Sequence, residues 1–251
     1  MERLEDRALD IVETATPKEL YRIFYLLSRQ RHRNTPLIRA VVYHLNKTSV
    51  SSLATVQLTN LVYALSTLNV YDVPILSKVC TELSNKEADL DPKLAMSLMT
   101  SFSRLRWRES NSIQMLLNIL DGKVKQSLQE EATDSGSVPS QQASPLDLLN
   151  TSDKVGLVWS LANLNLRTAQ SRDMVEKAVK SPDVQALRQS SPLLWLDVVW
   201  SLSVLQMLDA TSAASVLEEG FWGNLPGELL LVSLSLCVLQ MCVLRSIMCL
   251  F

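Results

Sequence analysis

A short pattern of apolar and small residues recurs six times along the chain. In each copy, the third of four positions is large and apolar and the fourth is small, as in Tyr25-Leu26-Leu27-Ser28 and Trp200-Ser201-Leu202-Ser203. We call the third residue of each copy its anchor and number the neighbouring positions from it. The anchors are Leu27, Leu65, Phe102, Leu161, Leu202 and Leu236. Except for the wider interval from Phe102 to Leu161, they stand about 34–41 residues apart, so the chain is built from repeats.

The positions around each anchor have helical spacing. Residues four before and three after an anchor share its face of an α-helix, and almost all of them are apolar. These residues are Ile23, Leu61, Leu98, Leu157, Val198 and Val232 on one side, and Gln30, Leu68, Leu105, Leu164, Leu205 and Leu239 on the other. A small residue follows each anchor, which lets a neighbouring helix approach closely. A second helical segment follows each copy, for instance from Pro74 through Leu83.

The wide interval between Phe102 and Leu161 predicts an insertion. Residues 125–145 are polar, rich in Pro, Gly and Ser, and without periodicity, which is typical of a loop. Without them the interval is about 38 residues, the length of a two-helix repeat. We therefore predict an all-α fold, an α-solenoid of about 38-residue two-helix repeats. Residues 1–124 would hold about three repeats, 125–145 a flexible insertion, and 146–251 two repeats plus an incomplete one.

A second set of positions predicts a binding surface. At 100° per residue, positions five before, two before and two after the anchor lie opposite the apolar stripe, and we call this set the column. It combines rings, amides and guanidinium groups, which stack on unpaired bases and bond to their edges in RNA-binding repeats. The column comprises Arg22/Tyr25/Arg29, Asn60/Tyr63/Thr67, Ser97/Thr100/Arg104, Gly156/Trp159/Asn163 and Asp197/Trp200/Val204.

Arginines beside the column extend the predicted site. Arg31, Arg33, Arg106 and Arg108 are placed to pair with phosphates. The candidate RNA-binding residues are therefore Arg22, Tyr25, Arg29, Arg31, Arg33, Tyr63, Arg104, Arg106, Trp159, Asn163 and Trp200. A structural alternative stays open, in which the aromatic side chains pack between repeats and residues 29–33 form a solvated turn.

Overall charge argues against a strongly basic nucleic-acid binder, since the formal net charge is −2 and the isoelectric point is near 5.8. The charge is unevenly distributed along the chain, because residues 17–47 alone carry a net charge of +6. Four cysteines, three of them between positions 237 and 249, favour reduced buried thiols over a disulfide framework.

Catalytic and metal-binding patterns are missing from the sequence. Six scattered glycines, with no His-Arg-Asp or Asp-Phe-Gly, exclude the phosphate loop and metal-binding motifs of a kinase. Cys80 with a histidine is a conceivable nucleophile, but packing of His44 and exposure of His32 are the favoured interpretation. Cys237, Cys242 and Cys249 would spread around a helix and not converge on a metal. We therefore expect no enzyme, no cofactor, no metal and no small-molecule substrate.

The apolar run 229–251 has three interpretations. It is long enough for a membrane span, although it contains Gln240 and Arg245. It also matches the fifth repeat, since Ser235–Met241 parallels Ser201–Met207. An aberrant tail after about Met241 is the third interpretation. The match favours a sixth repeat, so a membrane association is not expected.

The segments Asn34–Leu45 and Leu58–Ala64 resemble the FAST-kinase-domain family of mitochondrial RNA-binding proteins. This resemblance spans residues 17–228 and implies octotricopeptide-like repeats, a location in the mitochondrial matrix, and a role in the processing or stability of mitochondrial mRNA. The implied partner is single-stranded mitochondrial RNA. The family's C-terminal RAP domain and a presequence have no visible counterpart, so the resemblance predicts a truncated form. The alternative function is an armadillo- or HEAT-like scaffold that binds other proteins, which the acidic net charge favours.

Overall fold

A computed structural model describes residues 2–122, 145–146, 149–218 and 221. The chain divides into two compact units, Met1–Gly136 and Ser137–Phe251. Within the described residues every regular element is helical, which confirms the predicted all-α class. Most of the predicted insertion 125–145 and the whole run from 222 to 251, with the sixth anchor, lie outside the described residues. The predicted three-block layout therefore stays a prediction.

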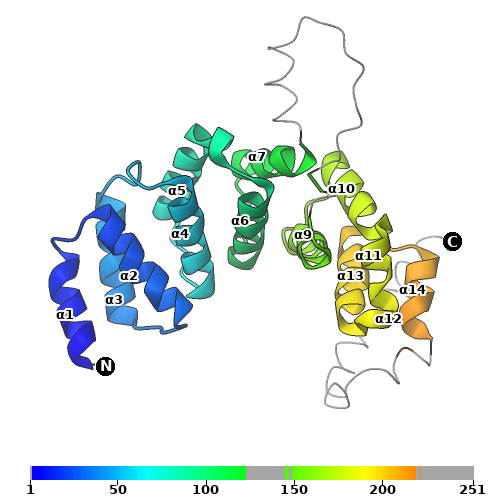
Figure 1. Cartoon of the computed structure of the whole chain (residues 1–251), viewed down its shortest axis with the longest axis horizontal. Coiled ribbons are helices and arrows are strands. Elements are labelled where there is room, and N and C mark those ends of the chain that lie inside the picture. The colour runs from blue at the N-terminus through cyan, green and yellow to red at the C-terminus, as the bar shows by residue number, and fades with distance from the viewer. Residues whose placement is uncertain (1, 123–144, 147–148, 219–220, 222–251) are drawn as a thin grey trace, which may run out of the picture. The chain divides into compact units, whose positions relative to one another are not determined.

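The first unit is two rows of helices (Figure 1). Its first row consists of α2 (Pro17–Arg29), α4 (Thr55–Thr67) and α6 (Pro92–Leu105), packed consecutively against one another. The second row consists of α3 (Thr35–Lys47), α5 (Val73–Asn85) and α7 (Ser110–Asp121), with α1 (Glu2–Val12) packed against α3. A short 3-10 helix, η1 (Glu87–Asp89), precedes α6. Each repeat thus contributes one helix to each row, as the periodicity predicts.

The second unit repeats the plan with a longer linker. The first helices are α9 (Thr151–Asn163) and α13 (Pro192–Leu205), which pack against each other, and the second helices are α10 (Ala169–Lys180) and α14 (Ala210–Leu217). Two single-turn helices, α11 (Pro182–Gln185) and α12 (Leu187–Ser190), fill the linker before α13. They account for the slightly wider interval between anchors Leu161 and Leu202.

Anchors lie in the core wherever the structure describes them. Leu65, Phe102 and Leu161 are fully buried, and Leu27 and Leu202 are 8% and 4% exposed. The small residue after the anchor is buried in the first four repeats and half-buried at Ser203. The hydroxyls of Ser28, Ser66 and Ser103 donate to main-chain carbonyls one turn earlier. Because that bond satisfies the hydroxyl locally, a polar residue can be buried against the adjacent helix.

The first repeat departs from the predicted stripe. Ile23 is half-buried, Gln30 is exposed, and Leu26 is 58% exposed. The equivalent residues of α4 and α6 are buried. Among the described helices, α2 has only one neighbour in the first row, whereas α4 lies between two. The corresponding face of α2 is partly open to solvent.

An identical turn joins the two helices of all five described repeats. The residue four after the anchor has a positive φ of 50° to 58°, and these residues are Arg31, Asn69, Arg106, Asn165 and Gln206. The next amide donates to the anchor's carbonyl, as from Trp107 to Phe102 at 2.9 Å. The left-handed residue itself donates to the carbonyl of the small residue after the anchor. This is the Schellman arrangement, built here without glycine.

Helix caps fall at fixed positions as well. The second helix always has its N-cap seven residues after the anchor, where a side-chain oxygen accepts from the third helical amide. The capping residues are Asn34, Asp72, Glu109, Thr168 and Asp209. The first helix always has its N-cap eleven residues before the anchor. The segment between these caps is thus constant, and the variation in repeat length falls in the second helices and the linkers that follow them.

Lysine side chains bind the linkers between repeats through hydrogen bonds and an ion pair. Lys78 donates to main-chain carbonyls at the end of α3, including Thr48 at 3.1 Å, and Lys86 donates to Ser51 at 3.0 Å and Leu53 at 2.6 Å. In the second unit the buried Lys154 of α9 pairs with Asp183 of α11 at 3.0 Å. Burial opposes ionisation of Asp183, but hydrogen bonds from Lys154, Ser181 and Thr151 outweigh it and lower the pKa of Asp183 to about 2.

We predict that Leu65→Ala lowers the free energy of unfolding by about 2–5 kcal/mol, since it opens a cavity beneath α4. The matched change Leu26→Ala on the exposed side of α2 should cost less than about 0.5 kcal/mol. Urea unfolding followed by circular dichroism measures both values. Equal effects of the two substitutions would contradict the anchor register.

Backbone conformation gives a second prediction, at Gln206. Glycine accepts a positive φ without a Cβ clash, so Gln206→Gly should leave stability unchanged or raise it by up to about 1 kcal/mol. Gln206→Val should instead lower stability by more than about 1 kcal/mol, because a β-branched side chain is strained there. Thermal unfolding of the two variants tests the turn, and a stable Val variant would refute its geometry.

Acid should weaken the Lys154–Asp183 pair over a defined range. The folded-state pKa of Asp183 is depressed from its ordinary 3.8, so its stabilising contribution is full above about pH 4 and disappears as the pH falls towards 2. The difference in urea midpoint between the unmodified protein and Asp183→Asn should therefore shrink over this range. A difference that stays constant from pH 5 to pH 2 would show that the ionised carboxylate contributes nothing.

Candidate nucleic-acid interface

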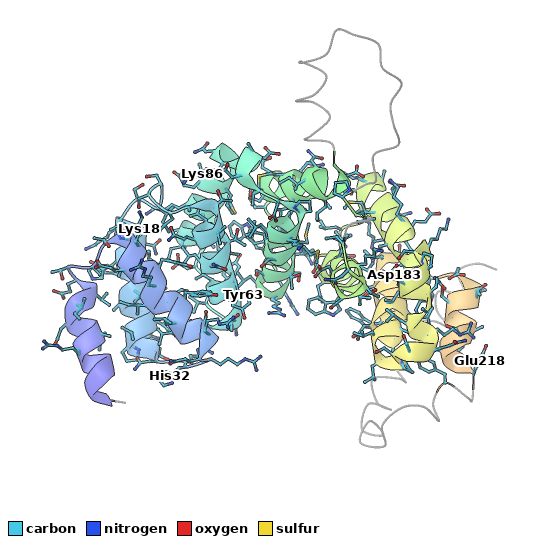
Figure 2. The ribbon with its side chains drawn as sticks, in the orientation of Figure 1. Lys18, His32, Tyr63, Lys86, Asp183 and Glu218 are labelled. Carbon is cyan, nitrogen blue, oxygen red and sulfur yellow. The ribbon has the colours of Figure 1, made fainter. Side chains whose placement is uncertain are left out.

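The column occupies the most accessible face of each first helix. On α4 the positions four and three before the anchor, and the anchor itself, are buried, whereas Asn60, Tyr63 and Thr67 are each half-buried. Figure 2 marks Tyr63 on this helix. The same positions on α6 are half-buried at Ser97 and Thr100 and exposed at Arg104. Side chains of the column can therefore reach a ligand while their helices remain packed.

Arginines of the column are exposed, but their surroundings differ. Arg22, Arg29 and Arg104 all lie at the surface. Arg22 stands one turn after Glu19, whose pKa is lowered by hydrogen bonds with Thr16 and by the positive charge of Arg22. Part of the Arg22 charge is thereby balanced within α2. Arg29 and Arg104 form no ion pair among the described residues, so they have more charge to offer a ligand.

Tyr25 is held by a neighbouring ring. Its ring stacks on that of Tyr21 with centroids 5.8 Å apart and planes inclined by 22°. The hydroxyl of Tyr21 accepts a hydrogen bond at 3.3 Å from Asn60, the column residue of the next repeat. This contact couples the first two repeats and orients Tyr25, which remains half-buried and not enclosed.

The second unit has a different column. Trp159, Asn163 and Trp200 are half-buried, and the two tryptophans hold the same position on the adjacent helices α9 and α13. None of the six column residues here is basic, and Asp197 is exposed. The unit as a whole has 7 Lys and Arg against 10 Asp and Glu, whereas the first unit has 17 against 16. Its column can offer aromatic stacking and amide groups but little phosphate attraction.

Arg31, Arg33 and Arg106 are exposed, and their pairing with phosphates stays a prediction. They belong to the turns after α2 and α6, beside the column. Sequence reasoning missed Tyr71, a 57% exposed aromatic residue in the intervening turn. The polar residue seven after each anchor could have located these turns, because it marks the start of every second helix.

The conceivable nucleophile has no support in the geometry. Cys80 is buried, and burial raises the pKa of its thiol, which keeps the unreactive neutral form. His44 packs edge-on against Tyr43 at 5.2 Å, and His32 is half-buried and not fully exposed as expected. In the described part of the chain, no group of three or more His, Cys, Asp or Glu residues is arranged to hold a metal ion. Cys237, Cys242 and Cys249 lie outside that part.

The described helices also include none with both the length and the hydrophobicity that crossing a membrane requires. The apolar run from 229 to 251, for which a membrane span was one interpretation, lies outside these residues.

Comparison with known proteins finds relatives across most of the chain. No family model matches it. The mouse protein FAST kinase domain-containing protein 4 is 24% identical over 220 residues, and the rat and human proteins of that name are each 26% identical over 226 and 227 residues. Each alignment covers 88% of this chain but only 31% of the relative. The chain is thus a distant relative of the FAST kinase domain-containing proteins, equivalent to less than a third of their length.

Proposed function

We propose that this chain binds single-stranded RNA along the column of its first helices. The observation that carries the proposal is the recurrence of an aromatic residue two positions before the anchor. Tyr25, Tyr63, Trp159 and Trp200 occupy that position in four of the five described repeats, each half-buried on the accessible face. Within each unit, aromatic rings at the same position on adjacent first helices are suited to stack on unpaired bases.

The remaining column residues supply the other contacts that RNA requires. Arg29 and Arg104 provide charge for phosphates, and Asn60 provides an amide for base edges. Exchange of one amide or hydroxyl between repeats would change the preferred base without changing the fold. This combination supports binding that is driven by stacking and tuned by polar groups.

The biological setting is proposed from the relatives. Similarity to FAST kinase domain-containing protein 4, together with the family resemblance, supports a location in the mitochondrial matrix and a role in the processing or stability of mitochondrial mRNA. We propose that the chain acts by binding, without catalysis. A buried thiol with a raised pKa is in keeping with that role.

A protein-interaction scaffold of armadillo or HEAT type is the second candidate. The observation that favours it is the second unit, which has an excess of acidic residues and a column with no arginine or lysine. Such a surface would attract a basic peptide more readily than a nucleic acid.

Binding of a fluorescent single-stranded RNA at several salt concentrations tests the proposal. Changing Arg22, Arg29 and Arg104 together to Ala should weaken binding to all sequences and reduce the salt slope by about 0.7 for each phosphate that is no longer bound. Trp159→Ala should weaken binding by about 1–3 kcal/mol with the slope unchanged, since stacking releases no counterions.

Tyr63→Ala and Tyr43→Ala form a matched control pair in the first unit. Tyr43 is exposed on α3, away from the column, and its loss should leave RNA affinity unchanged. Circular dichroism melts of each variant separate lost binding from lost folding, which is the main concern for Trp159. Unaltered affinity in well-folded Arg and Trp variants would exclude the column as the RNA site and favour the scaffold.

A further inference from the structure

Two turns of the first unit carry the same arginine pattern. Arginine stands two, four and six residues after the anchor in the first repeat, at Arg29, Arg31 and Arg33. It stands at the same three positions in the third repeat, at Arg104, Arg106 and Arg108. All six are exposed. Because the turn has one geometry in every repeat, the two sets share one edge of the unit, which we call the arginine edge.

The turn of the second repeat lies between these two turns along the chain and contacts the third. The ring of Tyr71, six residues after the second anchor, lies 6.2 Å from the ring of Trp107 in the third turn. The second and third turns are therefore in contact. In Figure 2, His32 marks the first of these turns at the lower edge of the unit, whereas Lys86 marks the linkers at the upper edge. The exposed ring of Tyr71 thus stands between two groups of guanidinium charges.

The fold itself does not account for these arginines. Arg31 and Arg106 occupy the left-handed position, where other repeats have Asn69, Asn165 and Gln206 and where a long side chain gains nothing. Lys78 and Lys86, by contrast, each bind several main-chain carbonyls. In the described part of the chain, the side chains of Arg31, Arg33 and Arg106 make no hydrogen bond or ion pair.

Arg167 shows what a structural arginine does at the equivalent turn of the second unit. It stands six residues after its anchor, as Arg33 does, and donates at 2.8 Å to the carbonyl of Val204 in the next repeat. Arg33 forms no such bond to its neighbour. Arg108 already interacts within the protein, so it is not counted among the ligand contacts below.

Negative charge near the edge is limited. The two nearest carboxylates in sequence are Asp72 and Glu109, the caps of α5 and α7. Asp72 accepts from the amide of Ile75 and from Asn46, and Glu109 accepts from Ser112. Both carboxylates thus bind the N-termini of their own helices. The six arginine charges of the two turns therefore exceed the negative charge beside them.

We propose that the arginine edge binds the phosphates of single-stranded RNA while Tyr71 stacks on a base between them. The proposal rests on the proposed function and extends its site into the turns, since Arg29 and Arg104 belong to both the column and the arginine edge. Neighbouring helices of this kind pack about 8–10 Å apart, so the two arginine groups would hold phosphates about 16–20 Å apart. The guanidinium fork suits phosphate oxygens, and an exposed tyrosine ring suits a base.

The test uses two fluorescent oligomers of equal length, an oligouridylate and an abasic ribose-phosphate chain. The edge variant combines Arg31→Asn, Arg33→Gln and Arg106→Asn, since asparagine already occupies the left-handed position at Asn69 and Asn165. Its control combines Arg7→Gln, Arg39→Gln and Lys47→Gln, which removes equal charge from exposed positions of α1 and α3. Melting curves verify that both variants fold.

We expect the edge variant to bind both oligomers at least about tenfold more weakly at 0.1 M salt, with a salt slope smaller by about two. The control variant should retain most of its affinity. Tyr71→Phe should bind normally, whereas Tyr71→Ala should weaken binding to the oligouridylate alone.

Two contrary outcomes are distinguishable. If the unmodified protein binds RNA and the column variants weaken it, but the edge variant matches its charge control, the arginine edge is overturned and the proposed function stands. If the unmodified protein binds neither oligomer, the proposed function fails and the arginine edge fails with it.

Discussion

The turn between the two helices of each repeat is the constraint on which the other features depend. Its left-handed residue and its cap lie four and seven residues after the anchor, so the second helix begins in the same register in all five described repeats. Both hydrogen bonds of the turn end on the anchor and the small residue after it. The residue pair that packs the core thus also accepts the bonds that reverse the chain.

Packing between first helices builds on that register. With Leu65 and Leu61 buried on one side of α4, and Ser66 small enough for close approach, each first helix presents the same outward positions as the last. A column of functional side chains requires nothing more than this repetition. The buried stripe and the proposed binding surface therefore occupy different faces of the same helix, so polar residues of the column can vary while anchors remain large and apolar.

Much of the fold could be predicted from the spacing of apolar residues, because a buried stripe depends mainly on helical period. Anchors such as Phe102 and Leu161 illustrate this success. The exposure of Gln30 and Leu26 could not be predicted, since helical spacing fixes the face on which a residue lies but not which neighbours cover that face. Nor could the positive φ of Arg31 and Arg106, because arginine is uncommon there and the residue alone gives no warning. The column positions were predicted from the 100° rotation per residue of an α-helix. Tyr71 follows the end of α4, where this rotation no longer applies, so the same reasoning could not find it.

Variation in linker length has a consequence for how such a chain can change. The interval between anchors differs from repeat to repeat, yet the extra residues before α13 form α11 and α12 and leave the first-helix segment between its two caps intact. Extra residues in this linker therefore leave the outward-facing positions of the first helix unchanged. The opposite edge admits none, since one added residue in the turn would rotate the whole second helix. Changes in repeat length can therefore be accommodated in the linkers, while the turn and the outward positions of the first helix keep their spacing from the anchor.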